Sequence, residues 1–321
     1  MLNSSGNTRG RRSLTMAKRK VLVCDSLDVA TLGLTDDFQV DYEPKITKPE
    51  LLAKAGDYDA LVVRSRTKVD ADVIAHAGRV RIIARSGSGV DNVDVRAAEA
   101  RGIEVVSSPE ALVEAVAEHV FGLMLALARG IPAADQVMKS GRWDKEMFTG
   151  VELRGKILGI AGLGRIGRRV AEVGKVFGMS LYAYDVVEVP QETLASLGCR
   201  MVDLDTLFAS SDFITIHVPL TAETRHMVDA RRLSLMKKTA FLINASRGDV
   251  IDEAALLKAL RANEIAGAGL DVFENEPTPG EIVTAPNLIA TPHIGGQTKD
   301  AQAMAVTIVG AKINQFFAGR R

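Results

Sequence analysis

The stretch Ile157-Leu-Gly-Ile-Ala161, followed by Gly162-Leu-Gly164-Arg165-Ile166-Gly167, decides the fold of this chain of 321 residues. The apolar run 157–161 predicts a buried strand, and residues 168–177 have the period of a helix. A further apolar run ends on Asp185, about 20 residues after the glycines. A strand, a glycine-rich turn, a helix and a strand ending in an acid predict a dinucleotide-binding unit of the Rossmann type.

Each residue type in this stretch has a physical reason. The glycines permit a tight turn and a close approach of a pyrophosphate to the helix N-terminus, whose free N–H groups bind phosphate. The Asp185 carboxylate can accept hydrogen bonds from a ribose 2′-OH and repels a 2′-phosphate. Val186 and Val187 follow and bring no cation to that position. The cofactor predicted is therefore NAD rather than NADP.

The rest of the chain alternates between strand and helix patterns. These patterns predict an α/β fold with two doubly wound parallel-sheet domains. The Rossmann cofactor domain, residues 110–294, is inserted in a flavodoxin-like substrate domain, residues 18–109 and 295–321. We expect strands at 21–24, 60–63, 81–84, 103–106, 157–161, 180–184, 213–218, 240–243, 266–270 and 288–290, and helices at 71–77, 95–100, 110–129 and 298–317. Residues 130–150 have no clear period and predict an arm.

Composition narrows the class of protein. Forty basic and forty acidic residues give no net charge, which argues against a nucleic-acid partner. Apolar runs fall short of the roughly 20 residues of a membrane helix, so no membrane partner is expected. Cys24 and Cys199 lie far apart, which predicts neither a disulfide nor a metal site and favours the cytoplasm. We interpret residues 1–17, which are basic and lack acids, as a disordered leader; a transit peptide is the less favoured alternative.

Polar residues follow several strands of the second domain. Because the carboxyl ends of parallel strands meet at one sheet edge, they are expected to converge. Arg247 suits a carboxylate clamp, since a guanidinium binds a carboxylate with two parallel bonds. His293 suits the acid and base, and Glu276 suits a partner that orients the imidazole. Glu274 and Glu281 remain alternatives for Glu276, and His217 remains one for His293.

At this point the chain resembles the D-isomer-specific 2-hydroxyacid dehydrogenase family over nearly everything after Lys20. Besides the glycine motif, the resemblance rests on Arg85-Ser-Gly87-Ser88-Gly89-Val90, Asn244-Ala245-Ser246-Arg247, Asp271 through Glu276-Pro277, and Thr291-Pro-His293-Ile-Gly295-Gly296. It implies that Arg247, Glu276 and His293 are catalytic. Glutamine replaces the glutamate in related formate dehydrogenases, which argues against formate. The implied cofactor contacts are Gly162, Gly164, Arg165, Ile166, Gly167, Asp185, Val218, Ala245, Ser246, Arg247, Asp271, His293, Gly295 and Gly296.

The substrate implied is a small anionic 2-hydroxy or 2-keto acid, held by Arg64, Ser65, Arg85, Gly87, Ser88, Gly89, Val90 and Arg247. Among subgroups the chain is most similar to short phosphoglycerate dehydrogenases of serine biosynthesis, which lack a serine-sensing domain. The segment 107–112 departs from the asparagine-rich pattern of that group. Hydroxypyruvate, glyoxylate, lactate or sulfolactate therefore remain alternatives, as does a corepressor-like protein that senses NAD without catalysis.

Two surface features are left open by the sequence. Arg64, Arg66 and Lys68 alternate at a strand end, which predicts one shared face. That face is either a solvated basic edge or a pocket for a second anionic group of the substrate. The apolar residues Trp143, Met147 and Phe148 of the arm, with helix 110–129, predict a homodimer.

Overall fold

The computed structural model describes residues 17–277 and 280–319. The predicted leader, residues 1–17, lies outside the described residues apart from Ala17. The chain divides into two compact units, one of residues 1–108 with 306–321 and one of residues 109–305. The prediction placed the second boundary at 294/295. Residues 295–305 cluster with the second unit, where Gly295 bonds to Asp271 and Gly296 packs against Leu112.

The first unit is built on a sheet of five parallel strands in the order β2-β1-β3-β4-β5. This is the flavodoxin-like order, so the predicted fold class is confirmed for this unit. The strands are β1 Arg19–Val23, β2 Phe38–Tyr42, β3 Ala60–Val63, β4 Ile82–Arg85 and β5 Glu104–Ser107. The helices are η1 Val29–Leu32, α1 Lys48–Lys54, η2 Ala55–Asp57, α2 Ala71–His76, α3 Val95–Ala100 and α11 Lys299–Ala318, which begins in the second unit.

Two apolar layers cover the faces of this sheet. Helices α1, α2 and α3 bury Leu51, Ile74 and Ala98 on one face. On the other face, the part of α11 that belongs to this unit buries Val309 and Ile313 against strand residues. The edge strand β2 and helix α1 were not predicted, because β2 is half exposed and carries Gln39 and Asp41 within its run.

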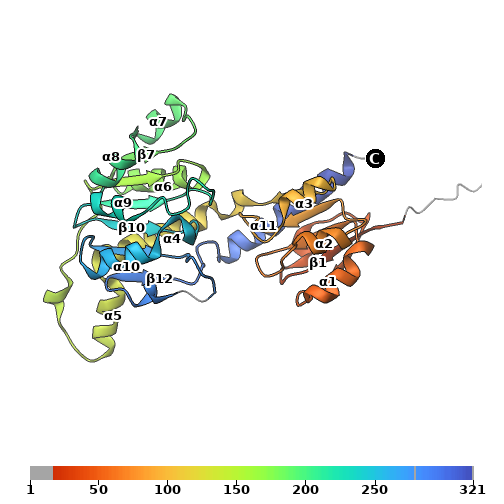
Figure 1. The fold of residues 1–321 in the computed structure, drawn as a ribbon, viewed down its shortest axis with the longest axis horizontal. Helices are drawn as coiled ribbons and strands as arrows, with labels where there is room; N and C mark the ends of the chain where they lie inside the picture. The colour runs from red at the N-terminus through yellow and green to blue at the C-terminus, as the bar shows by residue number, and fades with distance from the viewer. Residues whose placement is uncertain (1–16, 278–279, 320–321) are drawn as a thin grey trace, which may run out of the picture. The chain divides into compact units, whose positions relative to one another are not determined.

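The second unit holds seven parallel strands in the order β12-β11-β10-β9-β6-β7-β8; Figure 1 labels β7, β10 and β12 of this sheet. The order around β6 is that of a Rossmann sheet, which confirms the predicted class. The strands are β6 Ile157–Ala161, β7 Ser180–Tyr184, β8 Cys199–Met201, β9 Phe213–Ile216, β10 Phe241–Asn244, β11 Gly267–Leu270 and β12 Leu288–Ala290. Its helices are η3 Pro109–Leu112, α4 Val113–Arg129, α5 Ile131–Lys139, η4 Lys145–Phe148, α6 Arg165–Val176, α7 Gln191–Leu197, α8 Leu204–Ser210, α9 Ala230–Leu235, η5 Gly248–Val250, α10 Glu253–Arg261 and η6 Glu281–Thr284.

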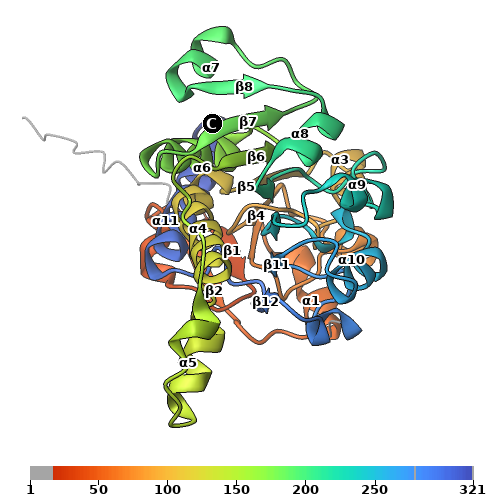
Figure 2. The ribbon, with the colours of Figure 1, turned by 90° about the vertical axis from the view of Figure 1, so that its left-hand side faces the viewer.

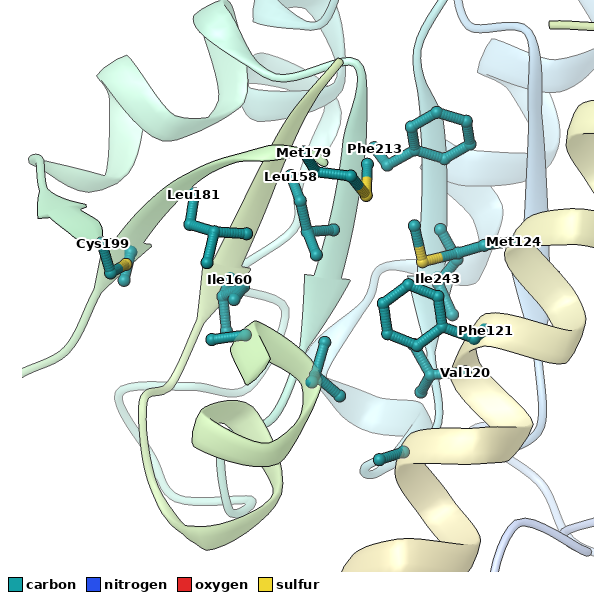
Figure 3. Packing of buried hydrophobic residues seen from close by; sticks show 14 of the residues in the cluster. Val120, Phe121, Met124, Leu158, Ile160, Met179, Leu181, Cys199, Phe213 and Ile243 are labelled. Atoms are coloured by element: carbon teal, nitrogen blue, oxygen red, sulfur yellow. The ribbon is translucent and has the colours of Figure 1, made fainter. Parts of the chain in front are cut away.

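Helix α4 is the central helix on one face of this sheet. Val120, Phe121 and Met124 point at β-strand residues such as Ile160 and Phe213 (Figure 3). The helix ends at Gly130, whose φ of 62° is readily adopted by glycine. The prediction that no apolar run reaches membrane length was wrong, since Pro109–Arg129 spans 21 residues and qualifies by length and composition. Half of that window is buried within the protein, as expected of a core helix.

The arm after α4 contains a helix that the sequence pattern did not predict. Helix α5 buries no residue and projects from the rest of its unit in both ribbon views (Figures 1 and 2). Trp143 beyond it is 78% exposed, and Met138 and Met147 are exposed as well. The run Gly130 to Pro132 was interpreted as the end of the preceding helix, which is why the helix that begins at Ile131 was missed.

Candidate functional site

Two of the three glycines of the fingerprint, Gly162 and Gly167, have a steric reason in the structure. Gly162 has a φ of 97°, and a Cβ there would lie 2.5 Å from the carbonyl oxygen of His217. A Cβ on Gly167 would lie 2.0 Å from the carbonyl oxygen of Gly162, so helix and strand approach as glycine alone allows. Around Gly164, which caps α6, a Cβ would meet nothing within 4 Å. The helix N-terminus therefore opens onto free space that suits a pyrophosphate.

Asp185 lies at the end of β7, beside the glycine turn. Its Oδ2 accepts from Leu163 N at 2.7 Å, and its Oδ1 accepts from Val187 N at 2.9 Å. A carboxylate has lone pairs beyond these two bonds, so it can also accept from ribose hydroxyls. Val186 and Val187 are exposed. Arg165 is exposed and Ile166 is half-buried on the same helix turn.

The loop after β10 is organised by a buried amide. Asn244 donates from Nδ2 to Arg247 O at 2.9 Å and accepts from Ser246 N and Oγ. Arg247 is half-buried, and its Nη1 donates to Ser246 O at 2.7 Å. A Cβ on Gly248 would lie 1.9 Å from the carbonyl carbon of Phe273. This close approach holds the loop of Arg247 against the segment that carries Glu276.

Of the three glutamates considered, Glu276 is the one the structure brings to His293. Glu276 Oε2 lies 2.8 Å from His293 Nδ1, and its Oε1 accepts from Phe273 N at 3.2 Å. Glu274 instead lies 3.0 Å from His226 Nε2, and Glu281 lies 3.6 Å from Arg261. The geometry thus separates alternatives that the sequence left open.

His217, the alternative acid and base, lies at the end of β9 with Val218 half-buried beside it. Its Nε2 lies 2.9 Å from Thr215 Oγ1. Burial lowers the pKa of His217 to about 4, so the ring is neutral near pH 7. A histidine in that state is a weaker proton donor at neutral pH.

The turn that carries His293 is built on Asp271, which is 1% exposed. The Asp271 carboxylate accepts from Thr291 Oγ1 at 2.6 Å, Ile294 N at 2.8 Å and Gly295 N at 2.7 Å. Burial opposes ionisation, but these bonds and one from His119 outweigh it and lower the pKa of Asp271. The side chain expected to contact the cofactor is therefore occupied by protein groups.

His119 is a residue of this site that sequence reasoning missed. It lies on α4, with Nε2 3.0 Å from Thr291 Oγ1 and 3.4 Å from Asp271 Oδ1. The two partners are separated by 172 residues, and a lone histidine on an apolar helix gives no signal of such a contact.

In the first unit the predicted substrate residues lie at the carboxyl ends of neighbouring strands. The expectation that Arg64, Arg66 and Lys68 share a strand face was wrong, because β3 ends at Val63 and the chain bends there. Arg66 turns back to Asp25 at 2.9 Å and donates to the carbonyls of Cys24, Pro44 and Ile46. Arg64 donates to Ser26 O at 3.1 Å.

The loop after β4 presents backbone rather than charge. Gly87 has a φ of 137°, its N–H donates to Ser108 Oγ at 2.9 Å, and the Arg85 guanidinium covers its Cα. Ser88, Gly89 and Val90 follow and are partly exposed, as Ser65 is exposed on the neighbouring loop. Among the residues with described placement, no group of three His, Cys, Asp or Glu side chains could hold a metal ion.

Comparisons with known proteins agree with this geometry. The family profile "D-isomer specific 2-hydroxyacid dehydrogenase, NAD binding domain" matches residues 121–295. D-3-phosphoglycerate dehydrogenase of Methanocaldococcus jannaschii is 46% identical over 303 residues, which cover 94% of this chain and 58% of that protein. The chain thus spans little more than half the length of the curated relatives it matches.

Solved structures give the same result. A glyoxylate reductase from Paecilomyes thermophila is 29% identical with a TM-score of 0.84, covering 94% of this chain and 95% of that one. D-lactate dehydrogenase from Aquifex aeolicus, complexed with NAD and lactic acid, is 29% identical with a TM-score of 0.81, covering 94% and 96%. The chain belongs to the D-isomer specific 2-hydroxyacid dehydrogenase family, and its second unit contains the NAD-binding domain of that family.

Proposed function

We propose that the protein transfers a hydride between NAD and C2 of a small anionic 2-hydroxy acid, with a phosphoglycerate-like dianion as the substrate. The observation that carries this proposal is the 2.8 Å pair of His293 and Glu276, at the sheet edge that also carries the glycine turn. The name of the M. jannaschii relative supports the substrate class. NAD supplies or accepts the hydride when bound.

The residues of the second unit divide the remaining work. Arg247 would clamp the carboxylate of the substrate and polarise the neighbouring carbonyl. With Nδ1 of His293 donating to Glu276, its Nε2 is the nitrogen left to protonate the carbonyl oxygen. Glu276 would orient the ring through its contact with Nδ1. The glycine turn and Asp185 would hold the dinucleotide.

In the first unit, we propose that the loop 87–90 holds the substrate carboxylate through backbone N–H groups. Arg64 is assigned the distal anionic group, such as a phosphate. Of the contacts described above, the Arg64 guanidinium makes one, to Ser26 O. The Arg66 guanidinium is bound by Asp25 and by three backbone carbonyls. A guanidinium with donors to spare suits a phosphate.

A panel of 2-keto acids with NADH, followed at the nicotinamide absorbance, tests this function. Phosphohydroxypyruvate should be reduced with the highest kcat/KM of the panel. A preference for glyoxylate, pyruvate or hydroxypyruvate would instead indicate a dehydrogenase of another 2-hydroxy acid, which is the second candidate function. The departure from the phosphoglycerate dehydrogenase pattern at residues 107–112 and the glyoxylate reductase among the structural relatives favour that candidate. No turnover with any of them, despite NADH binding, would favour a cofactor-sensing protein.

We propose discrimination against NADP by Asp185 and the two exposed valines after it. A 2′-phosphate placed near the carboxylate would meet a like charge and no arginine. kcat/KM measured with NADH and NADPH should differ strongly, and similar values would contradict the assignment.

We propose a homodimer through the arm of α5 and η4. Trp143 at 78% exposure, with Met138 and Met147, leaves large apolar side chains of this projecting segment in water, which favours contact with a second copy (Figure 2). Light scattering at micromolar concentration should give twice the mass of the chain, and Trp143→Glu should halve it. A cytoplasmic location is proposed because Cys24 and Cys199 are both free and buried.

A further inference from the structure

A polar network lies beneath the turn of His293 and involves a residue that the proposed reaction does not use. His119 is a partly buried side chain of α4, 19% exposed, inside an otherwise apolar helix face. Its Nε2 contacts Thr291 Oγ1 at 3.0 Å and Asp271 Oδ1 at 3.4 Å. All three residues belong to the second unit.

The hydrogen-bond directions in this network are fixed by counting protons. Asp271 is ionised and can only accept, so the single hydroxyl proton of Thr291 is donated to it at 2.6 Å. The Thr291 oxygen must then accept from His119. Nε2 of His119 therefore carries a proton and donates it to the Thr291 oxygen, while Thr291 donates its own proton to Asp271.

The network sets the conformation of the His293 turn. His293 has a φ of 54°, a left-handed conformation that favours glycine and persists in other residues where the surroundings impose it. Its N–H donates to Asp271 O at 2.8 Å, while the Asp271 carboxylate binds the next two N–H groups. Asp271 thus holds the backbone of the turn through both its carbonyl and its carboxylate. His119 contacts that carboxylate and the Thr291 hydroxyl that donates to it.

We propose that His119 is a positioning residue for the reaction, acting through Thr291 and Asp271 to keep His293 Nδ1 on Glu276. This inference rests on the proposed function, because it takes His293 as the proton donor. Without the Nε2–H of His119, the hydroxyl of Thr291 can turn away from Asp271, and the turn loses the support that holds its strained residue.

Two substitutions of His119 separate positioning from packing. His119→Gln keeps an N–H donor near the position of Nε2, and His119→Leu keeps bulk without a donor. For His119→Leu we expect kcat of keto-acid reduction to fall about twofold to tenfold, the usual effect of losing a hydrogen bond between neutral groups. The dissociation constant for NADH and the melting temperature should change little. His119→Gln should restore most of kcat.

A second readout does not depend on turnover. The chain has five histidines, so imidazole ¹⁵N–¹H spectra can follow His293 directly. The Nδ1–H signal of His293, downfield through its bond to Glu276, should weaken or shift in His119→Leu and persist in His119→Gln. If His119→Leu does not fold, Thr291→Val serves in its place, because it removes the bridging hydroxyl. It should weaken or shift the His293 signal in the same way. His76→Leu, on the exposed end of α2 in the first unit, is the matched control.

The outcomes distinguish this inference from the proposed function. An inactive wild-type protein would refute the function, while the His293 signal would still report on positioning. An active wild type with unchanged kcat and unchanged His293 signal in His119→Leu would overturn the inference. Equal losses of kcat and melting temperature in His119→Leu and His119→Gln would also overturn it, by showing a packing role.

Discussion

Glu276→Gln removes one charge from the carboxylate that lies 2.8 Å from His293 Nδ1 and keeps the size of the side chain. Two oxygens of Glu276 serve two donors, His293 Nδ1 and Phe273 N. An amide has one oxygen, so it can keep one of these bonds. The imidazole stays near its position, but it loses the negative charge of the carboxylate beside it. We therefore expect a milder loss of kcat than on removal of His293.

The size of the effect follows from exposure. The side chains of His293 and Glu276 are 53% and 36% exposed, so water screens the pair. Pairs of this kind contribute about 0.2–1 kcal/mol. A loss of that size in transition-state stabilisation corresponds to a rate constant lower by about 1.4-fold to fivefold. The kcat of reduction should therefore fall by about that factor in Glu276→Gln.

The assay is kcat of NADH-dependent reduction, measured with the best substrate of the panel. Glu274→Gln is the matched control, because it neutralises a carboxylate of the same loop that pairs with His226. The kcat should fall in Glu276→Gln and stay near the wild-type value in Glu274→Gln. An unchanged kcat in Glu276→Gln would refute the pairing, and a fall in Glu274→Gln alone would assign the partner to that glutamate.

Three further predictions follow from other contacts. His293→Ala should lower kcat about 10²–10⁴-fold while NADH titration gives a nearly unchanged dissociation constant, and a near-normal kcat would assign the donor elsewhere, with His217 the first alternative. Arg64→Ala should weaken the binding of a dianionic substrate about tenfold to a hundredfold and the binding of glyoxylate far less. Equal losses of affinity in competition assays would show that Arg64 has only a structural role. The pKa of Asp271 is lowered in the folded protein. Its carboxylate therefore stabilises the fold at pH values above the pKa of an unfolded aspartate, and this stabilisation is lost as the pH falls through the pKa of the folded state. The melting temperature of wild type should thus exceed that of Asp271→Asn more at pH 7 than at pH 3, and a constant difference in calorimetry would contradict this.

The parts of the fold that the sequence predicted best are short apolar runs and clear helical patterns, whether fully buried, as in β3, or half-exposed at a sheet edge, as in β12. The strands at 60–63, 157–161, 180–184 and 288–290 and the helix at 95–100 have the predicted bounds. In each of these elements, the apolar or helical pattern can be recognised from residues adjacent in the sequence. Strands β2 and β8 are edge strands with half-exposed residues, so their pattern is weak. Helix α5 has no buried face and was taken as irregular.

The candidate site divides in the same way. Arg247, Glu276 and His293 were chosen because they follow strands of one sheet, and topology brings such positions together. The contact of His119 with Thr291 depends on how α4 lies over β11 and β12, which no local pattern carries. Arg66 was misjudged because the bend after Val63 is set by Asp25, which lies at another strand end and accepts from Arg64 N at 2.6 Å.

Helix α11 places a segment that is made after the second unit in the core of the first unit, which is made before it. Val306, Val309, Ile313 and Phe317 cover the sheet face that includes Val21, Val23 and Ala84, from the opposite end of the chain. During synthesis, residues 109–305 form a contiguous unit that can fold as soon as it leaves the ribosome. The strands of residues 19–107 must meanwhile wait, with one apolar face uncovered, for a helix that is translated about 200 residues later. A chaperone or a nascent-chain partner would therefore meet this protein first at the bare face of its five-stranded sheet.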